Sequence, residues 1–244
     1  MRYERQLIIP QIGHEGQKKL EQSTVTVIGT GGLGSPVLTY LTSAGVGTIR
    51  IFDDDVASES NLNRQFLHNT EDVGKLKTLS AKEKLSQLNP NVNLVLFNIR
   101  LETENVEEYI AGSDVVVDCV DNIATRMTVA RACIKLNIPL VEGGVYGFSG
   151  YVMDIGREFP CLSCLGFDNV IPKTPIPVLG VTAGVIGCMQ ANECIKLLLG
   201  IGEPLYGRML SYDGLRGTWD EILVKKADDC PVHGNKEIDG GIKL

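Results

Sequence analysis

Short hydrophobic runs alternate with amphipathic stretches through the N-terminal half of the chain. Residues 24–28 are a continuous β-branched run, which is typical of a strand buried on both faces, and 115–120 is another mainly apolar run that predicts a strand. Between them, apolar residues recur at helical spacing in 37–44 and 74–88. Because strands and helices alternate, the pattern predicts an α/β fold with a doubly wound, mainly parallel sheet of Rossmann type.

The remaining elements continue this order until about Tyr146, where the pattern changes. Strands are expected at 24–28, 48–52, 92–99, 115–120 and 139–141, and helices at 15–22, 37–44, 74–88, 103–110 and 125–136. Further strands are expected at 149–155 and within 206–224, around a long helix at 181–199. We therefore expect a C-terminal antiparallel extension within a single domain, 1–244, that ends in a flexible tail at 235–244.

A glycine-rich loop lies directly between the first predicted strand and the helix after it. The loop reads G-T-G-G-L-G, with candidate nucleotide-binding glycines at Gly29, Gly31, Gly32 and Gly34. Glycine permits a tight turn and a close approach of the backbone to phosphate, and the helix N-terminus offers free N–H groups to an anion. Asp53 ends the next strand, where an acidic residue binds ribose hydroxyls. By itself this loop favours an NAD-dependent oxidoreductase.

Two basic residues and a second carboxylate are expected at the same edge of the sheet. Arg64 and Lys77 lie in the connection after the second strand, and Asp121 follows the strand at 115–120. Ligands of open parallel sheets bind outside the carboxyl ends of the strands. A triphosphate requires several cations and a carboxylate that holds Mg²⁺, whereas a dinucleotide requires few. Each residue alone is more often a solvated surface charge, but their joint placement favours ATP.

Two short cysteine motifs stand far apart in the chain. Cys161 and Cys164 form C-x-x-C, and Cys230 and His233 form C-x-x-H. Ligands separated by two residues suit a turn that places both on one tetrahedral ion, so the motifs predict a structural zinc knuckle. Unrelated buried thiols are the alternative. The other cysteines are expected to pack in the core and the other histidines to lie at the surface: Cys119, Cys133, Cys188, Cys194, His14 and His68.

Composition and charge exclude several classes of partner. The chain carries a formal net charge of −7, and nucleic-acid binding needs clustered Lys and Arg. The apolar stretch 178–199 is interrupted by polar residues, which favours a buried helix over a membrane span. Seven cysteines and no apolar segment after the first residues favour a reducing compartment. We expect a cytoplasmic protein without nucleic-acid or membrane partners.

Several motifs together make the chain similar to the MoeB/ThiF family, the bacterial and archaeal relatives of ubiquitin-activating enzymes. They follow the family's order from Arg2 to about Gly234 and comprise Arg5-Gln6, the glycine loop, Ser60 to Gln65, Val73 to Lys77 and Asp118 to Asn122. The segment Ser-Asn-Leu-Asn-Arg-Gln is far less common by chance than a glycine fingerprint alone.

The resemblance implies a role for each motif. Asp53 would bind the ATP ribose, Gly31 would pass under the phosphates, and Asp121 would hold Mg²⁺. The triphosphate would be contacted by Asn61, Arg64 and Lys77. Arg5 would reach the γ-phosphate of the neighbouring subunit, because the family works as a homodimer.

The activity implied by the resemblance is adenylylation of a carboxylate. The first expected substrate is the C-terminal glycine of a ubiquitin-like sulfur-carrier protein of the molybdopterin or thiamine type. A small-molecule carboxylate in cofactor biosynthesis, such as assembly of the methanogen iron-guanylylpyridinol cofactor, is the alternative, and an NAD-binding oxidoreductase is the second alternative. His233 replaces the family's usual fourth cysteine, and the segment 165–180 lacks the cysteine that many relatives use for covalent relay.

Overall fold

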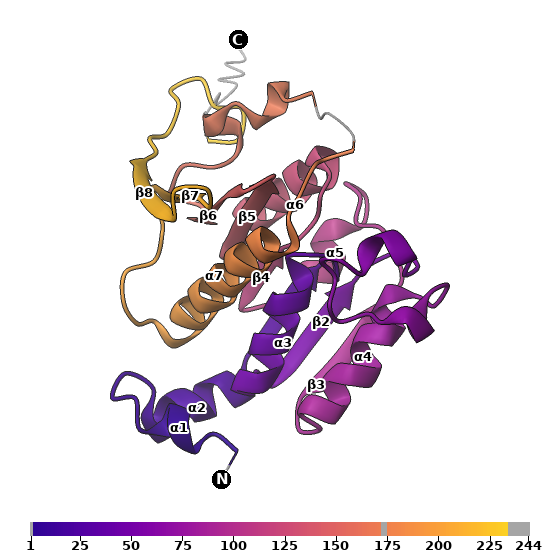
Figure 1. Cartoon of the computed structure of the whole chain (residues 1–244). Coiled ribbons are helices and arrows are strands. Elements are labelled where there is room, and N and C mark those ends of the chain that lie inside the picture. The colour runs from indigo at the N-terminus through magenta and orange to yellow at the C-terminus, as the bar shows by residue number, and fades with distance from the viewer. Residues whose placement is uncertain (1, 172–174, 234–244) are drawn as a thin grey trace, which may run out of the picture.

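A mixed sheet of eight strands forms the centre of the structure (Figure 1), a computed structural model that describes residues 2–171 and 175–233. The strand order is β3-β2-β1-β4-β5-β6-β7-β8. The tail predicted to be flexible, 235–244, lies outside the described residues.

The first five strands are parallel and make the doubly wound half. They are β1 (Thr24–Ile28), β2 (Thr48–Phe52), β3 (Asn93–Phe97), β4 (Val115–Asp118) and β5 (Leu140–Tyr146). In register, Ile28 pairs with both Phe52 and Asp118, so β1, β2 and β4 end at one level. The loops after these strands, which carry the predicted site, therefore meet at one edge of the sheet.

The last three strands are antiparallel, as the sequence predicts. They are β6 (Ser149–Ile155), β7 (Arg208–Asp213) and β8 (Thr218–Leu223). The expected strand 139–141 is too short, because pairing with β6 continues β5 from Leu140 to Tyr146.

Helices cover both faces of the sheet. They are α1 (Glu4–Leu7), α2 (Gly13–Gln22), α3 (Gly34–Ala44), α4 (Lys77–Leu88), α5 (Val106–Ile110), α6 (Ile123–Leu136) and α7 (Gly180–Leu199). α3, α4 and α7 pack on one face and α5 and α6 on the other (Figure 1), which gives the protein two layers of hydrophobic core. The helix expected at 74–88 begins later, because Gly74 has a φ of +89° and the helix starts only at Lys77.

The longest helix, α7, packs on α3 and on the strands β5 and β6. Its buried positions include polar side chains such as Gln190 and Glu193. Among residues 2–171 and 175–233, none of the helices combines the length and apolar character that a membrane span requires.

Candidate nucleotide site and cysteine–histidine cluster

The glycine loop is held tightly between β1 and α3. Gly29 has a φ of +96°, and its N–H donates to the Phe52 carbonyl at 2.7 Å. A Cβ on Gly34 would lie only 2.0 Å from the Gly29 carbonyl oxygen, so the start of α3 can pack on the loop only because Gly34 lacks a side chain. Within the described residues, the N–H groups of Gly31 and Gly32 donate no hydrogen bond. These free donors at a helix N-terminus suit an anion.

Asp53 lies beside the glycine loop, where the sequence places a ribose-binding carboxylate. Its Oδ2 accepts hydrogen bonds from the Thr30 N–H and hydroxyl, both at 2.8 Å, and its Oδ1 accepts one from the Asp55 N–H at 3.0 Å. The structure therefore connects the end of β2 to the loop after β1.

Arg64 lies against the glycine loop. A Cβ on Gly32 would be 3.6 Å from Arg64 Cγ, and the guanidinium donates to Ser60 O and Asn63 Oδ1, both at 2.9 Å. Asn61 shapes the same segment, because its side-chain oxygen accepts from the Ser58 N–H at 3.1 Å. The structure thus brings Arg64 and its supporting turn to the loop.

Lys77 begins α4 and is nearly buried, with 7% of its side chain exposed. Its ammonium pairs with Asp55 Oδ2 at 2.7 Å, and its N–H donates to the Asp55 carbonyl at 3.0 Å. This cation is therefore already neutralised by the carboxylate two residues after Asp53.

Asp121 is exposed in the loop after β4, and its carboxylate makes no hydrogen bond or ion pair within 2–171 and 175–233. Asn122 caps the next helix, because its side-chain oxygen accepts from the Thr125 N–H at 2.9 Å. Arg126 fixes the start of this loop, because its Nη2 donates to the Val120 carbonyl at 2.7 Å. Asp121 thus offers free carboxylate oxygens at the same edge of the sheet as the glycine loop.

A buried polar cluster under this loop was not found from the sequence. Arg126 is 5% exposed, and its guanidinium donates to Glu142, to the Gly143 carbonyl at 2.9 Å and to the Tyr151 hydroxyl at 2.8 Å. Asp118 is fully buried nearby, and burial raises its pKa although the Arg126 charge opposes that shift. The sequence carries one signal for the burial of Arg126. It lies three and four residues before the buried Val129 and Ala130, so it shares their face of α6.

Two predictions of whether a side chain is buried or exposed are wrong. His68 is not a surface residue: it is 4% exposed and lies between the glycine loop and α4. It stands in an irregular segment whose sequence has no periodicity, so only the tertiary fold determines its burial. Cys188 is exposed rather than packed in the core, because it lies on the outer side of α7. As predicted, His14 is exposed, and buried thiols occur at Cys119, Cys133 and Cys194.

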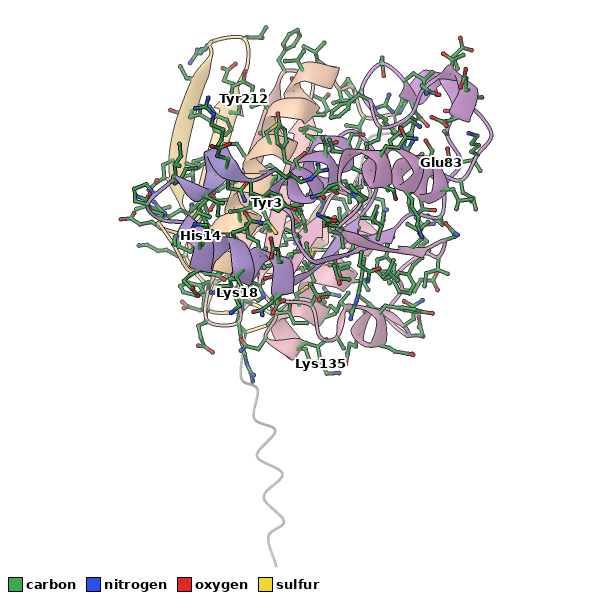
Figure 2. All side chains as sticks on the ribbon, turned by 90° about the horizontal axis from the view of Figure 1, so that it is seen from below. Tyr3, His14, Lys18, Glu83, Lys135 and Tyr212 are labelled. Carbon is green, nitrogen blue, oxygen red and sulfur yellow. The ribbon has the colours of Figure 1, made fainter. Side chains whose placement is uncertain are left out.

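Arg5 of the same chain is far from this site. Its neighbour Gln6 donates to the carbonyl of Ala44 at 3.0 Å, which is the last residue of α3, whereas the glycine loop adjoins the first. The eleven residues of α3 span about 16 Å. Figure 1 shows α1 and α2 at the lower end of the sheet, and in Figure 2, a view from below, Tyr3, His14 and Lys18 lie on one side of the molecule.

The four residues of the predicted zinc knuckle come from two segments that are far apart in the sequence, and they lie together in the folded chain. Their ligand atoms all lie within 4.8 Å of one another. The Cys161 Sγ lies 3.9 Å from Cys164 Sγ and 3.7 Å from Cys230 Sγ, and His233 Nδ1 lies 3.6 Å and 3.5 Å from the sulfurs of Cys164 and Cys230. A tetrahedral ion with bonds of about 2.3 Å to sulfur requires sulfur separations of about 3.8 Å. The cluster therefore has the geometry of a four-coordinate metal site.

Comparisons with known proteins agree with this arrangement. Residues 3–232 match the ThiF family. The sulfur carrier protein adenylyltransferase of Thermus thermophilus is 42% identical over 247 residues, covering 96% of this chain and 91% of that protein. The sulfur carrier protein ThiS adenylyltransferase of Escherichia coli is 41% identical over 244 residues, covering 98% and 97%. The crystal structure of E. coli MccB with MccA-N7isoASN shares the fold, with a TM-score of 0.83 at 21% identity over 96% of this chain and 75% of that one. The family resemblance expected from the motifs is confirmed, and the chain belongs to the ThiF family.

Proposed function

We propose that this protein is an ATP-dependent adenylyltransferase that activates the C-terminal glycine of a ubiquitin-like sulfur-carrier protein. The observation that carries the proposal is the 41% and 42% identity, over nearly the whole chain, to two proteins named sulfur carrier protein adenylyltransferases. The nucleotide site supports the same activity, because it combines free loop amides, two cations and a carboxylate at one edge of the sheet.

Different residues of the site would bind different parts of ATP. The free N–H groups of Gly31 and Gly32 would bind phosphate oxygens, within the cradle formed by Gly29 and Gly34, and Asp53 would bind the ribose. The triphosphate would be bound by Asn61, Arg64 and Lys77. These cations offset the repulsion between the incoming carboxylate and the polyphosphate.

The reaction needs positioning more than proton transfer. A carboxylate is already an anion at neutral pH, so no general base has to activate it. A carboxylate oxygen forms the new bond to the α-phosphorus, the bond to the β-phosphate oxygen breaks, and pyrophosphate leaves with that electron pair. In-line alignment of the two reactants is therefore the main contribution of the protein. The segment 165–180 has no cysteine, so the acyl-adenylate would pass to a separate acceptor.

Asp121 fits the role of a magnesium ligand. Its carboxylate is exposed and has no partner in the described part of the chain, and carboxylate oxygens are the protein ligands that Mg²⁺ prefers. When bound there, Mg²⁺ would neutralise phosphate charge.

The cysteine–histidine cluster would hold zinc through Cys161, Cys164, Cys230 and His233. The distances between their donor atoms fit a tetrahedral ion, and three thiolates with one imidazole are donors typical of structural zinc. Such an ion would tie the chain after β8 to the segment after β6. All seven cysteines are free, which suits a reducing compartment such as the cytoplasm. Elemental analysis of protein purified without chelators should give one zinc per chain.

Arg5 would complete the site of a second copy in a homodimer, because α3 separates it from the glycine loop of its own chain. Mixing Arg5→Ala protein with Asp121→Ala protein tests this arrangement. One of the two sites in a mixed dimer keeps both residues, so the mixture should regain part of the activity that both parents lack. A mixture as inactive as its parents would contradict the proposal.

The activity itself is tested by incorporation of labelled pyrophosphate into ATP in the presence of a sulfur-carrier protein ending in Gly-Gly. Asp121→Asn should abolish this exchange without lowering the melting temperature, and Glu104→Gln, at an exposed position outside the site, should leave both unchanged. Exchange that requires a small-molecule carboxylate would identify the alternative substrate class. Stabilisation by NAD but not by ATP–Mg²⁺ in a thermal-shift assay would instead support the oxidoreductase alternative.

A further inference from the structure

His68 connects the two elements that carry the phosphate-binding groups. It lies between β2 and α4, and both of its ring nitrogens have partners. Nε2 is 3.2 Å from the Thr30 carbonyl oxygen in the glycine loop, and Nδ1 is 2.9 Å from the Ser80 hydroxyl in the first turn of α4. Ser80 stands one turn after Lys77, so the imidazole bridges the loop to the start of this helix.

The partners of the ring determine its tautomer. A carbonyl oxygen can only accept, so Nε2 carries the proton and donates to Thr30. Nδ1 must then accept, and the Ser80 hydroxyl donates to it. The Ser80 oxygen in turn accepts from Lys84 Nζ at 3.0 Å, and Lys84 forms an ion pair with buried Asp72. Every polar group in this chain is satisfied when the ring is neutral.

The surroundings of the ring favour the same neutral form. Burial lowers the pKa of His68, and the nearby ammonium groups of Lys77 and Lys84 lower it further. The hydrogen bond to the Thr30 carbonyl and the charge of Asp53 act in the opposite direction but do not outweigh them. A second proton would turn Nδ1 into a donor, so the hydrogen bond that the Ser80 hydroxyl donates to it would be lost.

Thr30 connects His68 to the nucleotide site through its own hydrogen bonds. Its N–H and hydroxyl both donate to Asp53, and its carbonyl accepts from His68. All three polar groups of Thr30 are therefore fixed. Because Gly31 follows directly, the orientation of the free loop amides depends on how Thr30 is held.

We propose that His68 is a positioning residue of the nucleotide site, whose neutral ring holds the glycine loop, Asp53 and the Lys77 end of α4 in one arrangement for ATP. This inference rests on the proposed function, because it assumes that the loop binds ATP. It adds a residue that does not touch the nucleotide and a dependence of ATP binding on the protonation of that residue.

Two substitutions distinguish a positioning role of His68 from a role in packing alone. His68→Phe keeps a ring of similar size but makes neither hydrogen bond. His68→Gln offers an N–H to Thr30 and an oxygen to Ser80, and it does not titrate. The Kd for ATP–Mg²⁺ is measured by calorimetry from about pH 5.5 to about pH 8.5, the range in which imidazole titrates, together with the melting temperature.

At neutral pH, His68→Phe should raise the Kd about two- to tenfold, as expected when the neutral hydrogen bond that holds the Thr30 carbonyl of the glycine loop is lost, and His68→Gln should restore it. The wild-type Kd should rise more steeply on acidification than the Kd of His68→Gln, because the phosphates of ATP gain a proton in this range with both proteins and only the wild type also titrates His68. Ser80→Ala, which removes the donor to Nδ1, should also weaken binding and serves if His68→Phe does not fold.

The outcomes distinguish the two proposals. Wild-type protein that binds no ATP would overturn both the proposed function and this inference. Wild-type binding with an unchanged Kd in His68→Phe, even at a lower melting temperature, would overturn only the positioning role. Failure of His68→Gln to bind better than His68→Phe would do the same.

Discussion

Replacing Arg126 with Met would leave two carboxylates inside the protein without their cation. Asp118 and Glu142 are fully buried, and Arg126 is the charged group that faces both. The substitution also removes the donors to the carbonyls of Val120 and Gly143, at 2.7 Å and 2.9 Å. Removing one partner of a buried ion pair costs about 3–5 kcal/mol, a large share of the 5–15 kcal/mol by which folded domains are usually stable.

Urea unfolding at neutral pH measures this loss directly. In a domain of this size, each kcal/mol lowers the melting temperature by about 2–4 °C, so a fall of roughly 6–20 °C is expected. Arg131→Met on the same helix is a matched control, because Arg131 is 53% exposed and its ion pair with Asp168 contributes about 0–1 kcal/mol. Adding Glu142→Gln to Arg126→Met should recover part of the loss, because it removes one unpaired charge. Equal losses in Arg126→Met and Arg131→Met would refute the reasoning.

The deficit of Arg126→Met should also depend on pH. Burial raises the pKa of Asp118 above its usual value, and Arg126 restrains that shift, so the pKa should rise further in the variant. An acid whose pKa is higher in the folded state binds more protons when folded, and stability then falls as the pH rises from the unfolded pKa through the folded one. The gap between variant and wild type should therefore narrow from neutral pH to about pH 5.

Three further predictions concern other parts of the fold. Gly34→Ala should cost about 1–3 kcal/mol and weaken ATP binding in calorimetry, whereas Gly184→Ala, which has open space around its Cβ, should do neither; equal effects would contradict the clash. A strong chelator should lower the melting temperature of the wild type, and elemental analysis should find zinc retained in His233→Cys but depleted in His233→Ala. Burial, with the neighbouring Glu193 charge, raises the pKa of Asp154 to about 7, so this group makes stability fall as the pH rises from its ordinary pKa through about 7. Asp154→Asn should flatten that fall in urea unfolding, and an unchanged slope would argue against it.

The parts of the fold that depend on local pattern could be predicted from the sequence. The strand β1 has a continuous β-branched run, the other strands of the parallel half are mainly apolar, and the glycine loop and Asp53 follow strand ends as predicted. The strand expected at 139–141 is too short, because pairing with the later strand β6 continues β5 through Gly143 and Gly144. Long-range pairing of this kind leaves no local signal.

The candidate site likewise contains some residues whose place could be predicted from the sequence and others whose place could not. Residues placed by strand ends, such as Arg64 and Asp121, could be expected at one edge of the sheet. The burial of His68 and the cluster around Arg126 could not, because their partners are separated in sequence and meet only in the folded chain. The same holds for the ion pair between Lys77 and Asp55, which are 22 positions apart.

If Lys77 binds the triphosphate as proposed, nucleotide binding would replace one counter-ion of this lysine by another. The Lys77 side chain is 7% exposed, so without a partner its ammonium would be a desolvated charge, whereas Asp55 is 67% exposed and can turn into water. A phosphate that took the place of Asp55 would leave the lysine paired throughout, and the released carboxylate would regain its hydration. The contribution of Lys77 to ATP affinity would then be the difference between phosphate and carboxylate as partners of the same cation, because the desolvation of that cation already occurs on folding.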